Sequence, residues 1–240
     1  MTRECNADFK QIKKYIGSYS IDQNLKNSGY VSSLKLMHKC YFSSITWNAE
    51  LLYNKADFLA MESSSNEDII HRLVEVVSDL GSSLFNWANG NYKTSRVMLR
   101  VSIENFIKAL SALEDKGQLL EKNVYKLFEK ASSQKVFNSN DIINKCYQSL
   151  HSDYKLLCED THTATVQNME HLTSLSDLPA YEKEKSDNSS NVYIRVCKNI
   201  TSIFCIIFNT FYHQMHHRNR ENILNSLGRD VKPVITAPES

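Results

Sequence analysis

Proline and glycine, the residues that most often interrupt regular structure, are scarce in this sequence. Its 240 residues include three prolines and six glycines, and the first proline is Pro179. A chain with so few helix breakers favours long helices over many short strands. We therefore predict an all-α protein, an antiparallel helical bundle with a long C-terminal helix.

Other expected patterns are missing as well. The six cysteines form no C-x-x-C pair, and the first residues have no apolar core of the kind found in signal peptides. These two observations favour free thiols in a reducing cytoplasm. The longest apolar stretch, Ile200 to Tyr212, contains polar residues and is too short to cross a bilayer, so no membrane association is expected. No glycine-rich phosphate loop, G-x-S-x-G motif or zinc-finger spacing occurs, and we predict no cofactor or metal.

Charge of one sign is not in excess. The sequence has 28 Lys and Arg against 27 Asp and Glu, a net charge of +1. A protein that binds nucleic acid through overall charge would be more basic. Only local basic patches could serve that purpose here.

The order of apolar and polar segments indicates one helical domain over residues 1–228. Residues 182–191, EKEKSDNSSN, resemble a flexible, solvated linker. A last helix is expected over about Val192 to Leu227, ended by Gly228, and residues 229–240 would form a C-terminal tail.

The segment after Asn89-Gly90 is the most informative. It begins as a turn and continues to Leu113 without glycine or proline. At 100° per residue its apolar side chains cover most of the circumference, which is typical of a central helix. Arg100 and Glu104 lie among these apolar positions, and a buried charge must be paired or used. They form either an ion pair or a site in which Arg100 holds a phosphate.

Histidines provide the other candidate chemistry. His162 follows a predicted helix and Glu159-Asp160, and it is either a surface residue or a general acid–base group. His213, His216 and His217 form H-x-x-H-H near Arg218 and Arg220. On one helix this cluster would be a solvated end, a contact to RNA phosphate or, with the weakest support, a metal site.

Two motifs resemble a known family. The first is Asn89-Gly90-Asn91-Tyr92 followed by Leu99-Arg100-x-x-x-Glu104. The second is Tyr154-x-x-Leu157-Cys158-x-x-x-His162. Together they are similar to a branch of the helical HEPN superfamily, of which this chain would be a divergent member.

The resemblance implies a homodimeric helical bundle that acts in bacterial anti-phage defence or a toxin–antitoxin system, as a metal-independent endoribonuclease or an RNA-binding protein. It implies that Arg100 and His162 are catalytic and that Glu104 orients Arg100. We predict additional RNA contacts by Arg96, His217, Arg218 and Arg220.

The alternative is a non-catalytic module that binds a partner protein, such as an antitoxin or a defence-system subunit. Two observations favour it. The net charge is near zero. The superfamily's usual nuclease signature, an Arg followed a few positions later by a His, does not occur before His162, where Lys155, Leu156 and Leu157 stand.

Overall fold

A computed structural model describes Lys10, Lys14 and residues 17–61, 67–161, 174 and 177–237, without the side chains of 59–61 and 160–161. Over these residues the chain is helical and has no strand, which confirms the all-α prediction. The helices are η1 (Asp22–Lys26), α2 (Ser28–Tyr53), α3 (Lys55–Met61), α4 (Glu67–Ala88), α5 (Tyr92–Ser111), η2 (Lys116–Leu120), α6 (Val124–Ser133), α7 (Lys135–Asn138), α8 (Asp141–Thr161), α9 (Lys183–Ile207), α10 (Asn209–Gln214), α11 (His217–Asn225) and α12 (Lys232–Thr236).

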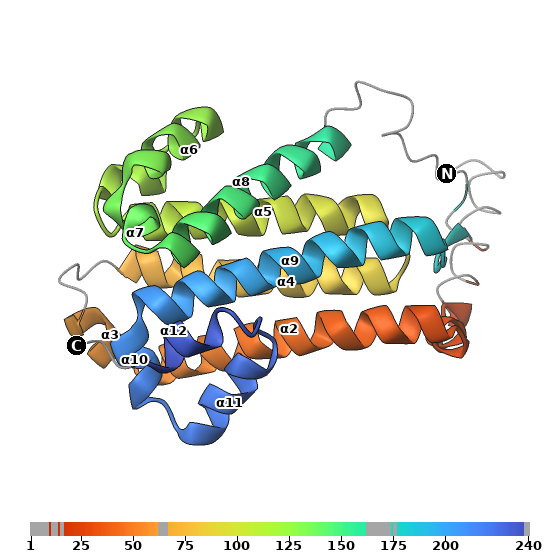
Figure 1. Cartoon of the computed structure of the whole chain (residues 1–240). Coiled ribbons are helices and arrows are strands. Elements are labelled where there is room, and N and C mark those ends of the chain that lie inside the picture. The colour runs from red at the N-terminus through yellow and green to blue at the C-terminus, as the bar shows by residue number, and fades with distance from the viewer. Residues whose placement is uncertain are drawn as a thin grey trace.

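Four long helices, α2, α4, α5 and α9, run side by side along the length of the bundle (Figure 1). α8 crosses obliquely over α5 and α9. α6 lies beside it and packs on α5, and α7 connects the two and contacts α8. α11 packs against α2 on the opposite side of the bundle. One cluster of buried side chains contains residues from α2 through to α12.

The expected turn joins α4 to α5. Gly90 has a φ of 78°, and a Cβ there would collide with the backbone of Ala180. The Gly90 and Asn91 amides donate hydrogen bonds to the carbonyls of Trp87 and Asn86, each at 2.9 Å. Glycine is needed at this position both for its conformation and for the close approach of another segment.

α5 is the central helix, as its apolar pattern predicts. Leu99, Ile103, Phe106, Ile107 and Leu110 are all buried. The helix contacts α4, α6, α8, α9 and η2. A buried polar side chain on α5 must therefore find a partner on α5 itself or on a neighbouring helix, or line a hollow between helices.

The prediction of a flexible linker over 182–191 is wrong. α9 begins at Lys183, and Ser186, Ser189 and Ser190 are buried. The Trp87 indole N–H donates a hydrogen bond to the carbonyl oxygen of Ser186 at 3.0 Å. Small serines spaced three and four residues apart form a narrow helix face that the large indole can approach, so a polar composition here indicates close packing rather than solvation.

The last helix is not continuous over 192–227. α9 ends at Ile207, and the non-helical backbone of Phe208 and Met215 separates α10 and α11 from it. The bend lets Phe208 and Phe211 both contact Phe58, with ring centroids at 4.9 and 5.5 Å. Aromatic packing of this kind outweighs the intrinsic preference for a continuous helix.

The segment expected as a tail also packs onto the bundle as far as it is described. α12 buries Ile235, whose carbonyl oxygen accepts a hydrogen bond from Asn209 Nδ2 at 2.8 Å. The side-chain amide of Asn209 is buried, and leaving its N–H group without a hydrogen-bond partner would destabilise the fold.

In the described part of the chain, no helix combines the length and the apolar character needed to cross a membrane.

Candidate functional site

A groove lies between α6 and α8, with α5 as its floor. Its volume is about 700 Å³, which is in the range of small-molecule pockets. The residues lining it come from these three helices and the segment before α6: Arg100, Lys122, Asn123, Val124, Tyr125, Phe128, Glu129, Ser132, His151, Tyr154, Lys155 and Cys158. Figure 1 shows α6 and the second half of α8 diverging from each other above α5.

Arg100 is the polar residue of the groove floor. Its Nε and Nη2 donate hydrogen bonds to the Tyr154 hydroxyl at 3.3 and 3.2 Å, and its guanidinium carbon lies 5.3 Å from the centre of the Tyr154 ring. Burial raises the pKa of Tyr154 to about 12, even though the hydrogen bond from Arg100 lowers it. The phenol is therefore neutral at physiological pH and does not neutralise the guanidinium.

Glu104, expected to orient Arg100, has a different partner. Its carboxylate accepts a hydrogen bond from Lys108 Nζ at 2.8 Å, one turn further along α5. Among the described residues no carboxylate lies within ion-pair distance of Arg100. Tyr154 therefore holds the guanidinium, and the expected role of Glu104 is not seen in these contacts.

His151 belongs to the groove and was not identified from the sequence. Its ring stacks on Phe128, with centroids 4.5 Å apart and planes inclined by 12°. Burial and the nearby charge of Lys155 lower its pKa. The imidazole is thus neutral near pH 7 and can accept a proton. Helical spacing could have found it, because His151 and Tyr154 are three residues apart and share a face of α8.

The rim of the groove is basic and aromatic. Lys122 and Lys155 are exposed, and Glu129 is the acidic residue among the lining side chains. The Tyr125 side chain is 89% exposed and lines the same groove. Cations and an exposed ring together suit a ligand that carries both phosphate and a planar base.

The remaining predicted residues do not gather at this groove. Arg96 lies one turn before Arg100 on α5 and is half-buried. His217, Arg218 and Arg220 are on α11, which packs on α2 at the opposite side of the bundle (Figure 1). His162 lies outside the described residues.

The H-x-x-H-H cluster is not on a single helix. His213 is in α10 and His217 begins α11, with Met215 extended between them. His213 Nε2 lies 3.1 Å from the carbonyl oxygen of Ile235, and His216 Nδ1 accepts a hydrogen bond from the Arg218 amide at 3.4 Å. The i,i+4 spacing that suggested a metal site therefore has no common helix face here. In the part of the chain described, no three His, Cys, Asp or Glu residues are grouped in a way that could hold a metal ion.

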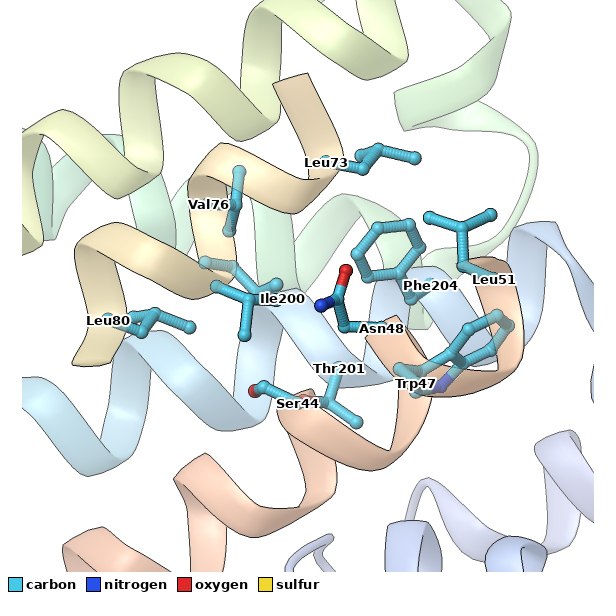
Figure 2. Close-up of a pocket in the computed structure, with 11 residues that line it drawn as sticks. Ser44, Trp47, Asn48, Leu51, Leu73, Val76, Leu80, Ile200, Thr201 and Phe204 are labelled. Atoms are coloured by element: carbon cyan, nitrogen blue, oxygen red, sulfur yellow. The ribbon is translucent and has the colours of Figure 1, made fainter. Parts of the chain in front are cut away.

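A second hollow lies inside the core, between α2, α4 and α9. Figure 2 shows the Asn48 amide pointing into it, between Ile200 and Phe204. Asn48 Oδ1 has no hydrogen-bond partner among the described residues. The volume is about 10 Å³, room for about one water molecule, so this hollow cannot take a substrate.

No family model, curated protein or solved structure matches the chain.

Proposed function

We propose that the groove between α6 and α8 binds single-stranded RNA and that the protein is an RNA-binding or RNA-cleaving protein. The observation that carries the proposal is Arg100: a half-buried guanidinium at the floor of an open groove, held by a neutral phenol instead of a carboxylate. Arginine paired in this way keeps its charge available for an anion.

The hydrogen bonds of Arg100 support a phosphate ligand. Nε and Nη2 are bonded to Tyr154, and Nη1 has no hydrogen-bond partner among the described residues. The N–H groups of Nη1 can therefore donate to a phosphate oxygen without breaking the contact to Tyr154. Lys122 and Lys155 can hold the adjacent phosphates from the two sides of the groove.

The aromatic side chains support a single strand over a duplex. Bases of a single strand are free to stack on protein rings, and Tyr125 offers an exposed ring next to Lys122. A duplex would present mainly its backbone to the protein. Because the net charge of the whole chain is only +1, binding depends on this local arrangement.

Cleavage would require a base near the phosphate that Arg100 holds. The neutral imidazole of His151 can take the proton of a ribose 2′-hydroxyl. The 2′-oxygen then attacks the adjacent phosphorus, and the 5′-oxygen leaves with a proton from an acid or from water. The products are a 2′,3′-cyclic phosphate and a 5′-hydroxyl. His162 stays the second candidate for proton transfer, and the resemblance to HEPN proteins supports a role in bacterial defence.

The binding test measures the affinity of a fluorescently labelled single-stranded RNA as a function of salt. Three cations in contact with phosphates predict a slope of log K against log salt of about −2, since each contact contributes about −0.7 on a single strand. Arg100→Ala should weaken binding about tenfold, equivalent to about 1.4 kcal/mol, and reduce the slope by about 0.7. Arg218→Ala, on α11, is the matched control and should have little effect.

If Arg218→Ala weakens binding as much as Arg100→Ala, RNA does not use this groove. If the wild-type protein binds no RNA at low salt, the alternative of a protein-binding module takes its place.

The cleavage test compares wild type, His151→Ala and His162→Ala on the same RNA, with total RNA from expressing bacteria analysed in parallel. Loss of cleavage with binding retained identifies the histidine that transfers the proton. RNA that stays intact with every protein, although it binds, restricts the function to RNA binding.

A further inference from the structure

The α6 wall of the groove carries a carboxylate among cations. Glu129 is exposed and lines the groove, whereas Arg100, Lys122 and Lys155 supply its positive charge. In the described part of the chain, no cationic side chain lies within ion-pair distance of Glu129, and its carboxylate accepts no hydrogen bond. Glu129 therefore holds no other side chain in place. In a groove that binds phosphate its charge repels the ligand, unless the carboxylate itself contacts a donor on that ligand.

Tyr125 shares this face of α6 with Glu129. The two residues are four positions apart, which places their Cβ atoms about 5 to 6 Å from each other. The Tyr125 ring is exposed. Phe128, by contrast, is buried with its ring against His151 and Tyr154, at centroid distances of 4.5 and 4.8 Å. A base that enters the groove therefore stacks on Tyr125, and its edge lies within reach of the Glu129 carboxylate.

The polar groups that follow Tyr125 on this face accept hydrogen bonds. A carboxylate has acceptors only. The Ser132 hydroxyl, one turn beyond Glu129, already donates to the Glu129 carbonyl oxygen at 2.6 Å and so offers its lone pairs. Guanine has two adjacent donors on its Watson–Crick edge, N1–H and N2–H, which match the two carboxylate oxygens. Adenine, cytosine and uracil each place an acceptor next to a single donor group, and the carboxylate repels that acceptor.

We propose that the groove prefers single-stranded RNA with a guanine on Tyr125, and that Glu129 determines this preference by accepting hydrogen bonds from guanine N1–H and N2–H. The inference rests on the proposed function, because it requires that RNA binds in this groove. A phosphate contact of Arg100 is the same for every base, and stacking on Tyr125 tolerates all four bases. Glu129 supplies the distinction between bases that neither of these contacts provides.

The test measures, at constant salt, the affinity of oligouridylates that carry one guanosine, adenosine or cytidine at the centre. We expect the wild-type protein to bind the guanosine RNA about tenfold more tightly than the others and than oligouridylate itself, the lower end for a bidentate contact because Glu129 is exposed. Inosine, which lacks the N2 amine, should lose part of this preference. 7-Deazaguanosine, which keeps N1–H and N2–H and lacks the N7 acceptor, should retain all of it.

Two matched variants separate the contact from the overall charge. Glu129→Gln replaces one acceptor oxygen by a donor amine and should reduce the guanosine preference to about twofold or less. Glu184→Gln, on α9, is the control, because Glu184 is exposed and does not line the groove. Both substitutions remove one negative charge and should strengthen RNA binding in general, so the ratio of affinities for two RNAs is compared. Circular dichroism of each variant verifies that it is folded.

The results that would overturn this inference differ from those that overturn the proposed function. Equal affinity for all four RNAs, with Arg100→Ala still weakening binding, would remove the guanine preference and leave RNA in the groove. A preference that Glu129→Gln retains, or that 7-deazaguanosine lacks, would assign recognition to other groups, such as cations that contact guanine O6 and N7. If the wild-type protein binds none of the RNAs, both the inference and the proposed function are wrong.

Discussion

Two arginines contact neighbouring residues of α8, and their environments differ. Arg195 on α9 binds Asp153 through bidentate hydrogen bonds, including Nε to Oδ2 at 2.9 Å. Arg100 on α5 binds Tyr154, the next residue, through two bonds to a neutral hydroxyl. The first pair joins α8 to α9 and is complete in itself. The second leaves a positive charge at the floor of a groove.

The charge of Arg195 stabilises the fold, whereas the charge of Arg100 can bind a ligand. The Asp153 side chain is 3% exposed, so it depends on Arg195 for its counter-charge. No carboxylate of the described residues lies within ion-pair distance of Arg100, although the charge of Glu104 favours its protonated form, so Arg100 breaks no ion pair by binding an anion. The chemical type of the residue is the same in both places, and only the partner on α8 decides which arginine can serve a ligand.

The largest effect is expected at the complete pair. Arg195→Ala should lower the free energy of unfolding by about 2 to 4 kcal/mol, because it leaves the Asp153 carboxylate buried and unpaired. The Arg195 side chain is 46% exposed, which places the loss below that of a fully buried pair. Urea unfolding measures it. The double variant with Asp153→Ala should be more stable than Arg195→Ala alone. If Arg195→Ala costs only about 0.5 kcal/mol, as substitutions at ordinary surface sites do, Asp153 does not depend on Arg195.

The next effect concerns Asp79, a buried carboxylate with no cation within ion-pair distance among the residues that the structure describes. Asp79 accepts a hydrogen bond from Asn105 Nδ2 at 2.9 Å, while Arg72 binds Asn105 Oδ1 instead. Burial raises the pKa of Asp79 to about 6, with the charge of Glu75 adding to the shift. The folded state therefore holds this proton more tightly than the unfolded state does.

The free energy of unfolding should therefore fall as the pH rises from about 4 to about 6. Asp79 contributes a decrease on the order of 2 to 3 kcal/mol. Asp79→Asn keeps the shape and can still accept from Asn105. The free energy of unfolding of this variant should not show the decrease between pH 4 and pH 6. The variant should therefore be more stable than wild type above pH 7. A constant difference between the two proteins from pH 4 to pH 8 would show that Asp79 is not perturbed.

The smallest effect is expected at the groove itself. Tyr154→Phe keeps the ring against Phe128 and removes the hydroxyl that Arg100 contacts. The free energy of unfolding should fall by about 1 to 2 kcal/mol. RNA affinity should fall less than in Arg100→Ala, because the guanidinium keeps its charge. An affinity loss as large as that of Arg100→Ala would mean that the Tyr154 hydroxyl is itself required for binding and that the charge of Arg100 alone does not hold the RNA.

Much of the fold follows from local patterns in the sequence. The scarcity of breakers predicts helices, Asn89-Gly90 predicts the turn, and the apolar circumference of 92–113 predicts the central helix. The predictions of a linker over 182–191 and of a single last helix are wrong because amino-acid composition does not show what a segment packs against. From composition alone Ser186 and Ser189 are expected to be exposed to solvent, yet both are buried. The bend at Phe208 depends on a contact with Phe58, which is distant in sequence.

The site could be predicted in part. Arg100 stands out because a charge on a helix that is apolar all round needs an explanation, and Tyr154 belongs to the second motif. The contact between them depends on how α5 and α8 cross. His151 and Tyr125 carry no motif, and their place in the groove follows from the packing of α6 on α8. The basic residues of α11 are expected from the sequence to make additional RNA contacts, yet they lie on the opposite side of the bundle from Arg100.

The most direct test of the central claim locates bound RNA on the protein. A single-stranded RNA containing a photoreactive uridine analogue is cross-linked to the wild-type protein, and the modified peptides are identified by mass spectrometry. We expect cross-links in 122–132 and 151–158, with Tyr125 prominent, and their loss in Arg100→Ala. Cross-links confined to 217–225 would contradict it and place the RNA on α11.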